Sequence, residues 1–287
     1  MRFSRFRVLR TRRGISFFFA EALITFGVLS GCLQVVLGIW PSTVEIGIWL
    51  LFGTITISTL RAITKIPSTE TIQHKISHPE ILITIKRGDL FSERSHLIIG
   101  FTDTFDTDSS DGVVISSTSV QGQFQNLFYA NAREDLDSQL STALQSREIQ
   151  NRESRTQKPR GKLDRYEIGT VVPLGAPGRH FFCVAYGRMQ NNLVVQSSTD
   201  ALWISLSSTW ETVRQYGHLL PVAMPVIGSD MARVTALSRE NLLKMILLSF
   251  VAHSRQSPIT RSFTVVVHPK DFTEINVLEM RAFLHTL

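Results

Sequence analysis

The chain has 287 residues with a formal net charge of +6 at pH 7, which is long for one domain. Its two cysteines, Cys32 and Cys183, are too few for a disulfide framework and have no partner at metal-binding or redox spacing. Six of the arginines lie within the first thirteen residues, directly before an apolar run. This placement favours contact with an anionic membrane surface and argues against binding of nucleic acid.

Two apolar runs follow the arginines, Ile15 to Trp40 and Ile46 to Leu60. As a helix, the first is about 39 Å long, enough to cross a hydrocarbon core of about 30 Å. The second is about 22 Å long and spans only if flanking residues contribute and Arg61 snorkels. A cleaved signal peptide has a shorter apolar core, and a buried soluble hairpin would show a polar face. We therefore predict that residues 1–65 form a two-helix transmembrane hairpin.

The charges around this hairpin predict its orientation. Arginines precede the first run, Arg61 and Lys65 close the second, and the connection Pro41 to Glu45 has no Lys or Arg. By the positive-inside rule, both termini are expected in the cytoplasm.

Within the first run, Gly27 and Gly31 form a GxxxG pattern, with Gly38 on the same face. This pattern allows close helix packing, either against the second span or between protomers. Glu21 either marks a polar path in the membrane or reaches the headgroups.

Residues 66–79 are polar and are expected to form a linker. They include His74 and His78, a spacing that can bind metal on a helix, but no third ligand is in view. We expect these histidines to be solvated and predict no metal site.

From Glu80 onward, strand-length apolar runs alternate with helical patterns, which predicts an α/β domain over 80–287 with a central mixed sheet flanked by helices on both faces. The expected strands are Ile81–Ile85, His96–Phe101, Val113–Ile115, Tyr166–Leu174, His180–Gly187, Leu219–Ile227 and Ser262–Val267. The expected helices are Phe124–Ala132, Arg133–Ser146, Asp200–Tyr216, Ser238–His253 and Phe272–His285. The charge-rich segment Arg147–Arg165 is either a mobile, solvated loop or a segment that closes over an anionic ligand.

Three strand or helix ends in this domain carry residues suited to a nucleotide. Asp89 follows the first strand and suits an exocyclic amino group such as that of adenine. Ser117 to Gln123 opens a helix, whose amides and dipole favour a phosphate. Ile227 to Met231 contains a glycine that lets the chain approach a diphosphate or ribose. Because ligands of α/β sheets bind at the carboxyl ends of strands, these residues predict a nucleotide-diphosphate pocket.

The order of these motifs resembles that of macro domains. Gly88-Asp-Leu90 is similar to their adenine-binding Gly-Asp-Ile motif, and Leu220 to Ser229 is similar to their phosphate-binding segment. Tyr166 to Val171 and the strand after it resemble the paired strands between these motifs. The resemblance covers roughly residues 80–287 and implies a three-layer, macro-like fold.

The sequence departs from hydrolytic macro domains at two places. Gly100 to Thr107 replaces their Asn-Ala-Ala-Asn motif, and Ser119 to Gln123 replaces their glycine-rich loop. In the family the asparagine orients the ribose and water, so its loss implies a protein that is not an enzyme. No catalytic triad or metal-ligand set is evident that would argue otherwise.

A divergent macro domain behind a two-helix hairpin is similar to the effector of a subset of Thoeris antiphage defence systems. The resemblance implies a partner with a TIR domain that converts NAD into an ADP-ribose-type signal, histidine-ADP-ribose in this subgroup. Binding of the signal is then expected to make the protein oligomerise and disrupt the bacterial inner membrane, which kills the infected cell. No cofactor is implied apart from this signalling nucleotide. The alternatives are a membrane-tethered ADP-ribosyl hydrolase and a reader of ADP-ribosylated proteins.

The resemblance also assigns roles to residues. Asp89, beside Leu90, would contact adenine, and Phe101 and Thr102 would line the ribose side. The segment 121–123 would face the diphosphate, and the segment 228–230 would complete the phosphate and distal-ribose end. Asp103 with Asp230 would select a cationic or amino-bearing distal group. The expected ligand-binding residues are therefore Asp89, Leu90, Phe101, Thr102, Asp103, Gln121, Gly122, Gln123, Gly228, Ser229 and Asp230.

Overall fold

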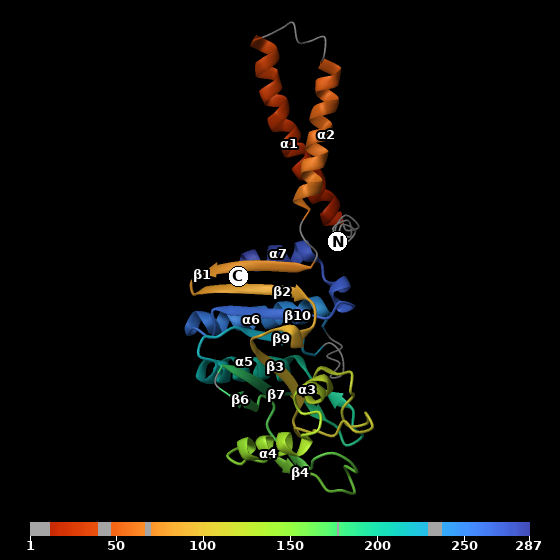
Figure 1. Ribbon diagram of the computed structural model, residues 1–287, viewed down its shortest axis with the longest axis vertical. Helices are drawn as coiled ribbons and strands as arrows, with labels where there is room; N and C mark the ends of the chain where they lie inside the picture. The colour runs from red at the N-terminus through yellow and green to blue at the C-terminus, as the bar shows by residue number, and fades with distance from the viewer. Residues whose placement is uncertain (1–11, 40–46, 67–69, 177, 229–236) are drawn as a thin grey trace. The chain divides into compact units, whose positions relative to one another are not determined.

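The computed structural model describes residues 12–39, 47–66, 70–176, 178–228 and 237–287 (Figure 1). Most of the arginine cluster, the connection Pro41 to Glu45, and the expected site residues Ser229 and Asp230 lie outside these ranges. The chain divides into two compact units: residues 1–72 with 276–282, which include the N-terminal helices, and residues 73–275 with 283–287, which include nearly all of the sheet.

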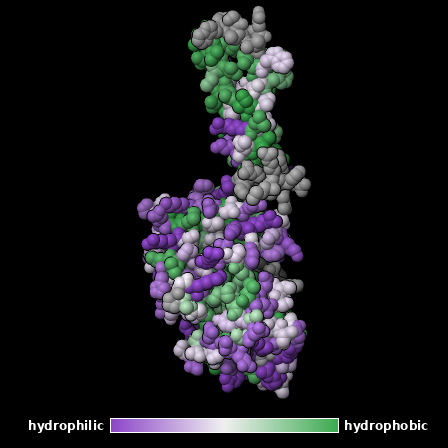
Figure 2. Space-filling view, in the orientation of Figure 1, coloured by the Kyte–Doolittle hydropathy of each residue, from purple (hydrophilic) through white to green (hydrophobic). Residues whose placement is uncertain are grey.

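The first unit holds helices α1 (Arg12–Ile39) and α2 (Gly47–Lys65), which agree with the two predicted apolar helices. Each is long and apolar enough to cross a membrane, judged by length and composition. Figure 2 shows that their exposed surface is mostly hydrophobic. These properties suggest that the protein associates with a membrane.

The two helices contact one another, and the buried residues of α2 have small side chains. Thr54, Ser58 and Ala62 are buried and recur every four residues, so they lie along one face of α2. The Thr54 hydroxyl donates to Leu50 O at 2.6 Å, and the Ser58 hydroxyl donates to Thr54 O at 2.7 Å. Since these hydroxyls are satisfied within their own helix, they can pack closely in an apolar environment.

The glycines of α1 lie away from this contact. A Cβ atom added at Gly27, Gly31 or Gly38 would have no neighbouring heavy atom within 4 Å. Of the two roles left open for the GxxxG pattern, packing within the hairpin is therefore not the one seen, and the glycine face remains uncovered.

The second unit is built on an eight-stranded mixed sheet with the order β1-β2-β10-β9-β3-β7-β6, and β8 pairs with β7. β10 runs parallel to β2 and β9, β3 runs parallel to β7 and β9, and β6 is antiparallel to β7. The predicted central mixed sheet is confirmed. Its strands are β1 (Thr71–Ser77), β2 (Glu80–Arg87), β3 (His96–Thr102), β6 (Val171–Ala176), β7 (Arg179–Met189), β8 (Val195–Gln196), β9 (Val222–Pro225) and β10 (Ser262–Val267).

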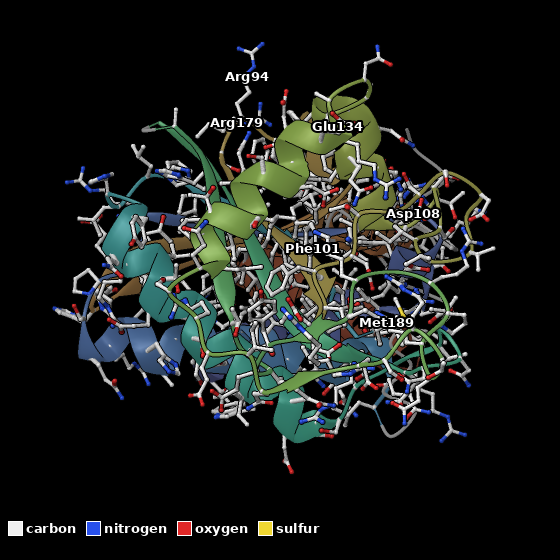
Figure 3. All side chains as sticks on the ribbon, turned by 90° about the horizontal axis from the view of Figure 1, so that it is seen from below. Arg94, Phe101, Asp108, Glu134, Arg179 and Met189 are labelled. Atoms are coloured by element: carbon white, nitrogen blue, oxygen red, sulfur yellow. The ribbon has the colours of Figure 1, made fainter. Side chains whose placement is uncertain are left out.

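Helices cover both faces of this sheet (Figure 3). On one face, Leu97, Ile99 and Phe101 of β3 share a core with the aromatic and leucine side chains of α3 and α4. On the other, Trp210 of α5 packs edge-on against Phe263 of β10, with ring centroids 5.3 Å apart. The helices of this unit are α3 (Val120–Phe128), α4 (Arg133–Leu144), α5 (Thr199–Tyr216) and α6 (Arg239–Gln256), with short 3₁₀ turns at η3 (Leu90–Ser92) and η4 (Asp271–Glu274). The last helix, α7 (Val277–Thr286), is divided between the two units.

Two sequence predictions about strands are wrong. Half of the expected linker forms strand β1, in which Ile72 and Ile76 are buried while Gln73 and Lys75 are exposed. This is the two-residue period of a strand, hidden in a largely polar segment. Conversely, Val113–Ile115 forms no strand, because Val114 and Ile115 pack against Met189 as a small separate core.

The two histidines expected in the linker also differ from that expectation. His74 lies on β1, and its ring packs edge-on against His285, with centroids 4.8 Å apart. Within the described ranges, no three His, Cys, Asp or Glu side chains come together as metal ligands.

Candidate ligand-binding site

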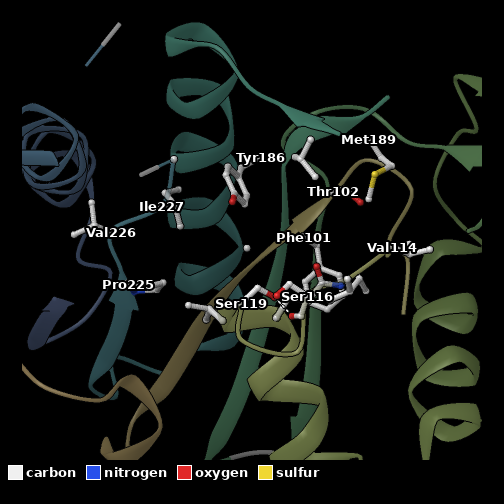
Figure 4. A pocket seen from close by; sticks show the side chains of 16 residues that line it. Phe101, Thr102, Val114, Ser116, Ser119, Tyr186, Met189, Pro225, Val226 and Ile227 are labelled. Atoms are coloured by element: carbon white, nitrogen blue, oxygen red, sulfur yellow. Dashed lines mark hydrogen bonds between the residues drawn. The ribbon is translucent and has the colours of Figure 1, made fainter. Parts of the chain in front are cut away.

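A pocket opens where β3 and β9 end and α3 begins (Figure 4). About 730 Å³ of space lies between the protein atoms that line it, a volume that includes its open mouth. None of the described residues that line it is charged. The lining consists of Gly100, Phe101, Thr102, Val114, Ile115, Ser116, Ser119, Val120, Gln121, Tyr186, Met189, Val195, Pro225, Val226, Ile227 and Gly228.

The start of α3 supplies hydrogen-bond donors to this pocket. Ser119 is the N-cap, and its side-chain oxygen accepts from the Gly122 amide at 3.0 Å. The amides of Val120 and Gln121 are the first two of the helix, which leaves them without an acceptor inside it. Because both residues line the pocket, this end of α3 is suited to an anionic group such as a diphosphate.

Gly122 serves this arrangement indirectly. A Cβ atom there would lie 2.2 Å from Ser116 O, so only glycine lets the preceding turn pass so close to the helix. Gln123 is exposed, and its side-chain amide donates to Thr118 O at 2.8 Å. The structure thus places Gln121 in the pocket wall, while its two neighbours shape the helix start.

Gly228 lines the pocket immediately after β9. Its backbone has φ of +83°, and a Cβ atom there would lie 2.8 Å from Leu202 Cδ1. A side chain at this position would be strained and crowded. Of the expected segment 228–230, Gly228 is the described part.

Phe101 and Thr102 also line the pocket, at the end of β3. Phe101 stacks on Phe105 with ring centroids 5.8 Å apart and belongs to the core. The Thr102 and Thr104 hydroxyl oxygens lie 3.2 Å apart. These two residues form a wall that is part core and part ligand surface.

Asp89 and Leu90 lie outside this pocket. Asp89 caps η3, and its carboxylate accepts from the Phe91 amide at 3.0 Å, while Leu90 is buried in the core. A neighbouring hollow of about 400 Å³ shares Val120, Pro225 and Val226 with the pocket and extends to Val267 of β10. Gly88 N donates to Val267 O at 3.0 Å, so Asp89 follows a residue bonded to the rim of that hollow.

Asp103 is a structural residue in this fold. It is buried, and one carboxylate oxygen accepts from the Met189 amide at 2.8 Å while the other accepts from Arg165 Nη1 at 2.8 Å. Asp103 does not line the pocket. Its charge is therefore already paired with Arg165.

The basic segment 147–165 is held to the domain by such pairs. It contains the antiparallel strands β4 (Asn151–Arg152) and β5 (Asp164–Arg165). Lys158 is fully buried, with its Nζ 3.1 Å from Asp106 Oδ2 and 2.6 Å from Lys162 O. Burial lowers the pKa of Lys158, and the Asp106 carboxylate opposes that shift. The expectation of a solvated loop is wrong for Lys158, and no described residue of the segment lines the pocket.

Sequence reasoning missed Tyr186 and Met189, which line the pocket from β7. The pairing of β3 with β7 shifts between Phe101 and Thr102, so that Phe101 pairs with Ala185 and Thr102 with Gly187. Tyr186 is the extra residue of this bulge. A bulge depends on the partner strand and leaves no pattern of its own in the sequence.

Comparison with known proteins now places this geometry in a family. The family model described as "Thoeris protein ThsA, Macro domain" matches residues 83–268. No curated protein matches the chain in a sequence search.

Solved structures show the same fold. An aspartate-to-alanine mutant of the Oceanobacillus iheyensis macrodomain aligns with a TM-score of 0.51 and 12% identity, over 76% of this chain and 99% of that one. An asparagine-to-alanine mutant of the same macrodomain aligns with a TM-score of 0.50 and 12% identity, over 76% of this chain and 95% of that one. The family match covers well over half of the sequence, and the chain therefore belongs to the Thoeris ThsA macro-domain family.

Proposed function

We propose that this protein is an antiphage sensor and effector whose macro domain binds an ADP-ribose-type signal. The signal would be made from NAD by a TIR-domain partner, as histidine-ADP-ribose. Binding would drive oligomerisation, and α1 and α2 would then disrupt the bacterial inner membrane and kill the infected cell. The observation that carries the proposal is the uncharged pocket at the start of α3, in a chain of this family.

The pocket supports this ligand class in two ways. The first amides of α3, at Val120 and Gln121, suit a diphosphate, and Gly228 keeps the opposite wall free of a side chain. The hollow beyond Val226 continues toward the segment that carries Asp89. A molecule as long as ADP-ribose would thus have its diphosphate at α3 and its adenine toward Asp89.

Binding without turnover is part of the proposal. The segment 100–107 stands where hydrolytic macro domains carry asparagine, and its two carboxylates have protein partners. Asp103 pairs with Arg165, and Asp106 pairs with Lys158. Neither lines the pocket, where it would be needed as a base for a water molecule.

The membrane step needs more than one protomer. Two helices have too little polar surface to enclose an aqueous path, so several hairpins would have to meet. A ligand favours assembly only if it binds the assembled state more tightly than the free one. The uncovered face of Gly27 and Gly31 is suited to close packing between spans. Both termini would be cytoplasmic, which puts the macro domain where the signal is made.

The proposal is tested in cells that produce the TIR partner's signal, by following membrane potential with a dye. Wild-type cells should depolarise only when the signal is made. Gly228→Glu should abolish this response, because the side chain strains the backbone and crowds Leu202. Signal-independent depolarisation, or release of ADP-ribose from modified proteins by wild type but not by Gly228→Glu, would contradict the proposal. The second result would favour a hydrolase.

A further inference from the structure

Tyr186 occupies an unusual position on the sheet. It is the bulged residue of β7 and stands between Ala185 and Gly187, which pair with the consecutive residues Phe101 and Thr102 of β3. A bulge re-aims the side chain that it carries. Tyr186 is half-buried, and its ring reaches the pocket instead of continuing the alternation of β7.

The ring of Tyr186 packs against Gly100 of β3. A Cβ atom at Gly100 would lie 2.4 Å from Tyr186 Cε1 and 2.9 Å from Cδ1. The tyrosine ring therefore lies directly against the glycine backbone, in the space that any other residue would fill. The glycine and the bulge together set where the ring stands.

The ring forms part of the pocket wall. Figure 4 shows Tyr186 pointing into it, between Ile227 of the β9 end and Thr102 of the β3 end, with Ser119 of the α3 N-terminus facing it. A ligand whose diphosphate lies at α3 would share this pocket with the ring and with Met189 and Val195, which line it too.

We propose that Tyr186 is a specificity-determining residue that packs its ring against the sugar or planar group next to the diphosphate, and that Gly100 is present to seat it. The proposal rests on the proposed function and adds the residue that reads the ligand beyond its phosphates. Because a flat group gains affinity by stacking on an aromatic side chain, loss of the ring should weaken binding about tenfold, which corresponds to about 1.4 kcal/mol.

The experiment is a double-mutant cycle on the full-length protein in lipid nanodiscs, titrated with ADP-ribose by calorimetry. Tyr186→Ala should bind about tenfold more weakly than wild type, whereas Tyr186→Phe, which keeps the ring, should stay within about threefold. Tyr186→Leu replaces the alanine variant if the latter unfolds. Tyr216→Ala, at an exposed tyrosine at the end of α5, is the matched control and should bind like wild type.

The variant Gly100→Ala tests whether Gly100 positions the Tyr186 ring or has only a general structural role. Its methyl group must push the Tyr186 ring off the backbone and into the pocket, so this variant should lose about tenfold or more in affinity. In the Tyr186→Ala background the same change should cost nothing further, because the ring is gone. Additive losses in the double variant would overturn the role of Gly100.

Two other outcomes are decisive. If wild type binds ADP-ribose and Tyr186→Ala binds within twofold of it, the inference about Tyr186 is wrong while the proposed function stands. If wild type itself does not bind ADP-ribose, the proposed function fails and this inference falls with it.

Discussion

Lys158 Nζ lies 3.1 Å from Asp106 Oδ2, and both side chains are buried, with exposures of 0% and 1%. The pair joins the basic segment to the loop that follows β3. That loop also accepts a hydrogen bond from a residue of the pocket wall: Gln121 Nε2 donates to Asp106 O at 2.7 Å. A buried ion pair outside the pocket thus stabilises the backbone of Asp106, to which Gln121 of the pocket wall is hydrogen-bonded.

Removing the cation should be costly. Lys158→Met leaves the Asp106 carboxylate buried without its partner, so we expect a loss of about 3–5 kcal/mol in the free energy of unfolding. Urea denaturation of the purified protein measures this. Arg147→Met, at an exposed position of the same segment, should change stability by less than about 0.5 kcal/mol. Adding Asp106→Asn to Lys158→Met should restore part of the loss, and equal stability of wild type and Lys158→Met would disprove the role of the pair.

Acid should destabilise the domain through His96. This side chain is fully buried; its Nδ1 accepts from the His180 amide at 2.8 Å, and its Nε2 lies 3.1 Å from Gly217 O. Burial lowers the pKa of His96 below 6.5. Below that pH the unfolded chain binds a proton that the folded chain does not, so stability falls as pH falls, by up to about 1.4 kcal/mol per pH unit.

The check is a series of unfolding measurements between pH 7.5 and about pH 5. His96→Gln should flatten the decline, although it will lower stability at neutral pH. The same substitution at the exposed His78 should leave the slope as it is. An unchanged slope in His96→Gln would mean that other groups cause the acid sensitivity.

The glycine face of α1 should matter for the membrane step and not for binding. Gly31→Leu should leave the affinity for ADP-ribose unchanged and slow signal-dependent depolarisation, because a bulky side chain keeps spans apart. Val36→Leu adds bulk at another exposed position of α1, well around the helix from Gly31, and should have little effect. Depolarisation of Gly31→Leu cells at the wild-type rate would rule out packing of spans through this face.

Topology is predicted by charge alone. A reporter fused at Ser42 should be active in the periplasm, and one fused at Leu287 should be active in the cytoplasm. Ser42 lies outside the described residues, in the connection between the two helices. Cytoplasmic activity at Ser42 would show that the hairpin does not span.

Much of the fold could be predicted because buried parallel strands read as continuous apolar runs. Such runs located β2, β3, β7 and β10 closely. β1 was hidden because only Ile72 and Ile76 are apolar in a polar strand, and Val113–Ile115 was misread because apolarity alone cannot separate a strand from a packed loop.

The candidate site, like the fold, could be predicted where it depends on neighbouring residues and not where it depends on contacts between distant ones. The ends of β3 and β9 and the start of α3 were predictable, because ligands bind at strand ends, and Phe101, Thr102, Gln121 and Gly228 do line the pocket. Tyr186 was not, because a bulge arises from the pairing of two strands. Nor was the pairing of Asp103 with Arg165, residues far apart in the sequence that meet only in the fold.

The central claim is that the pocket at the start of α3 binds an ADP-ribose-type ligand. Calorimetric titration of the full-length protein in nanodiscs with ADP-ribose tests it most directly, with Gly228→Glu alongside and the ligand recovered and analysed afterwards. We predict saturable binding of one ligand per protomer to wild type, no binding to a folded Gly228→Glu, and intact ADP-ribose at the end. Absence of binding to wild type, equal binding to both proteins, or breakdown of the ligand would contradict the account.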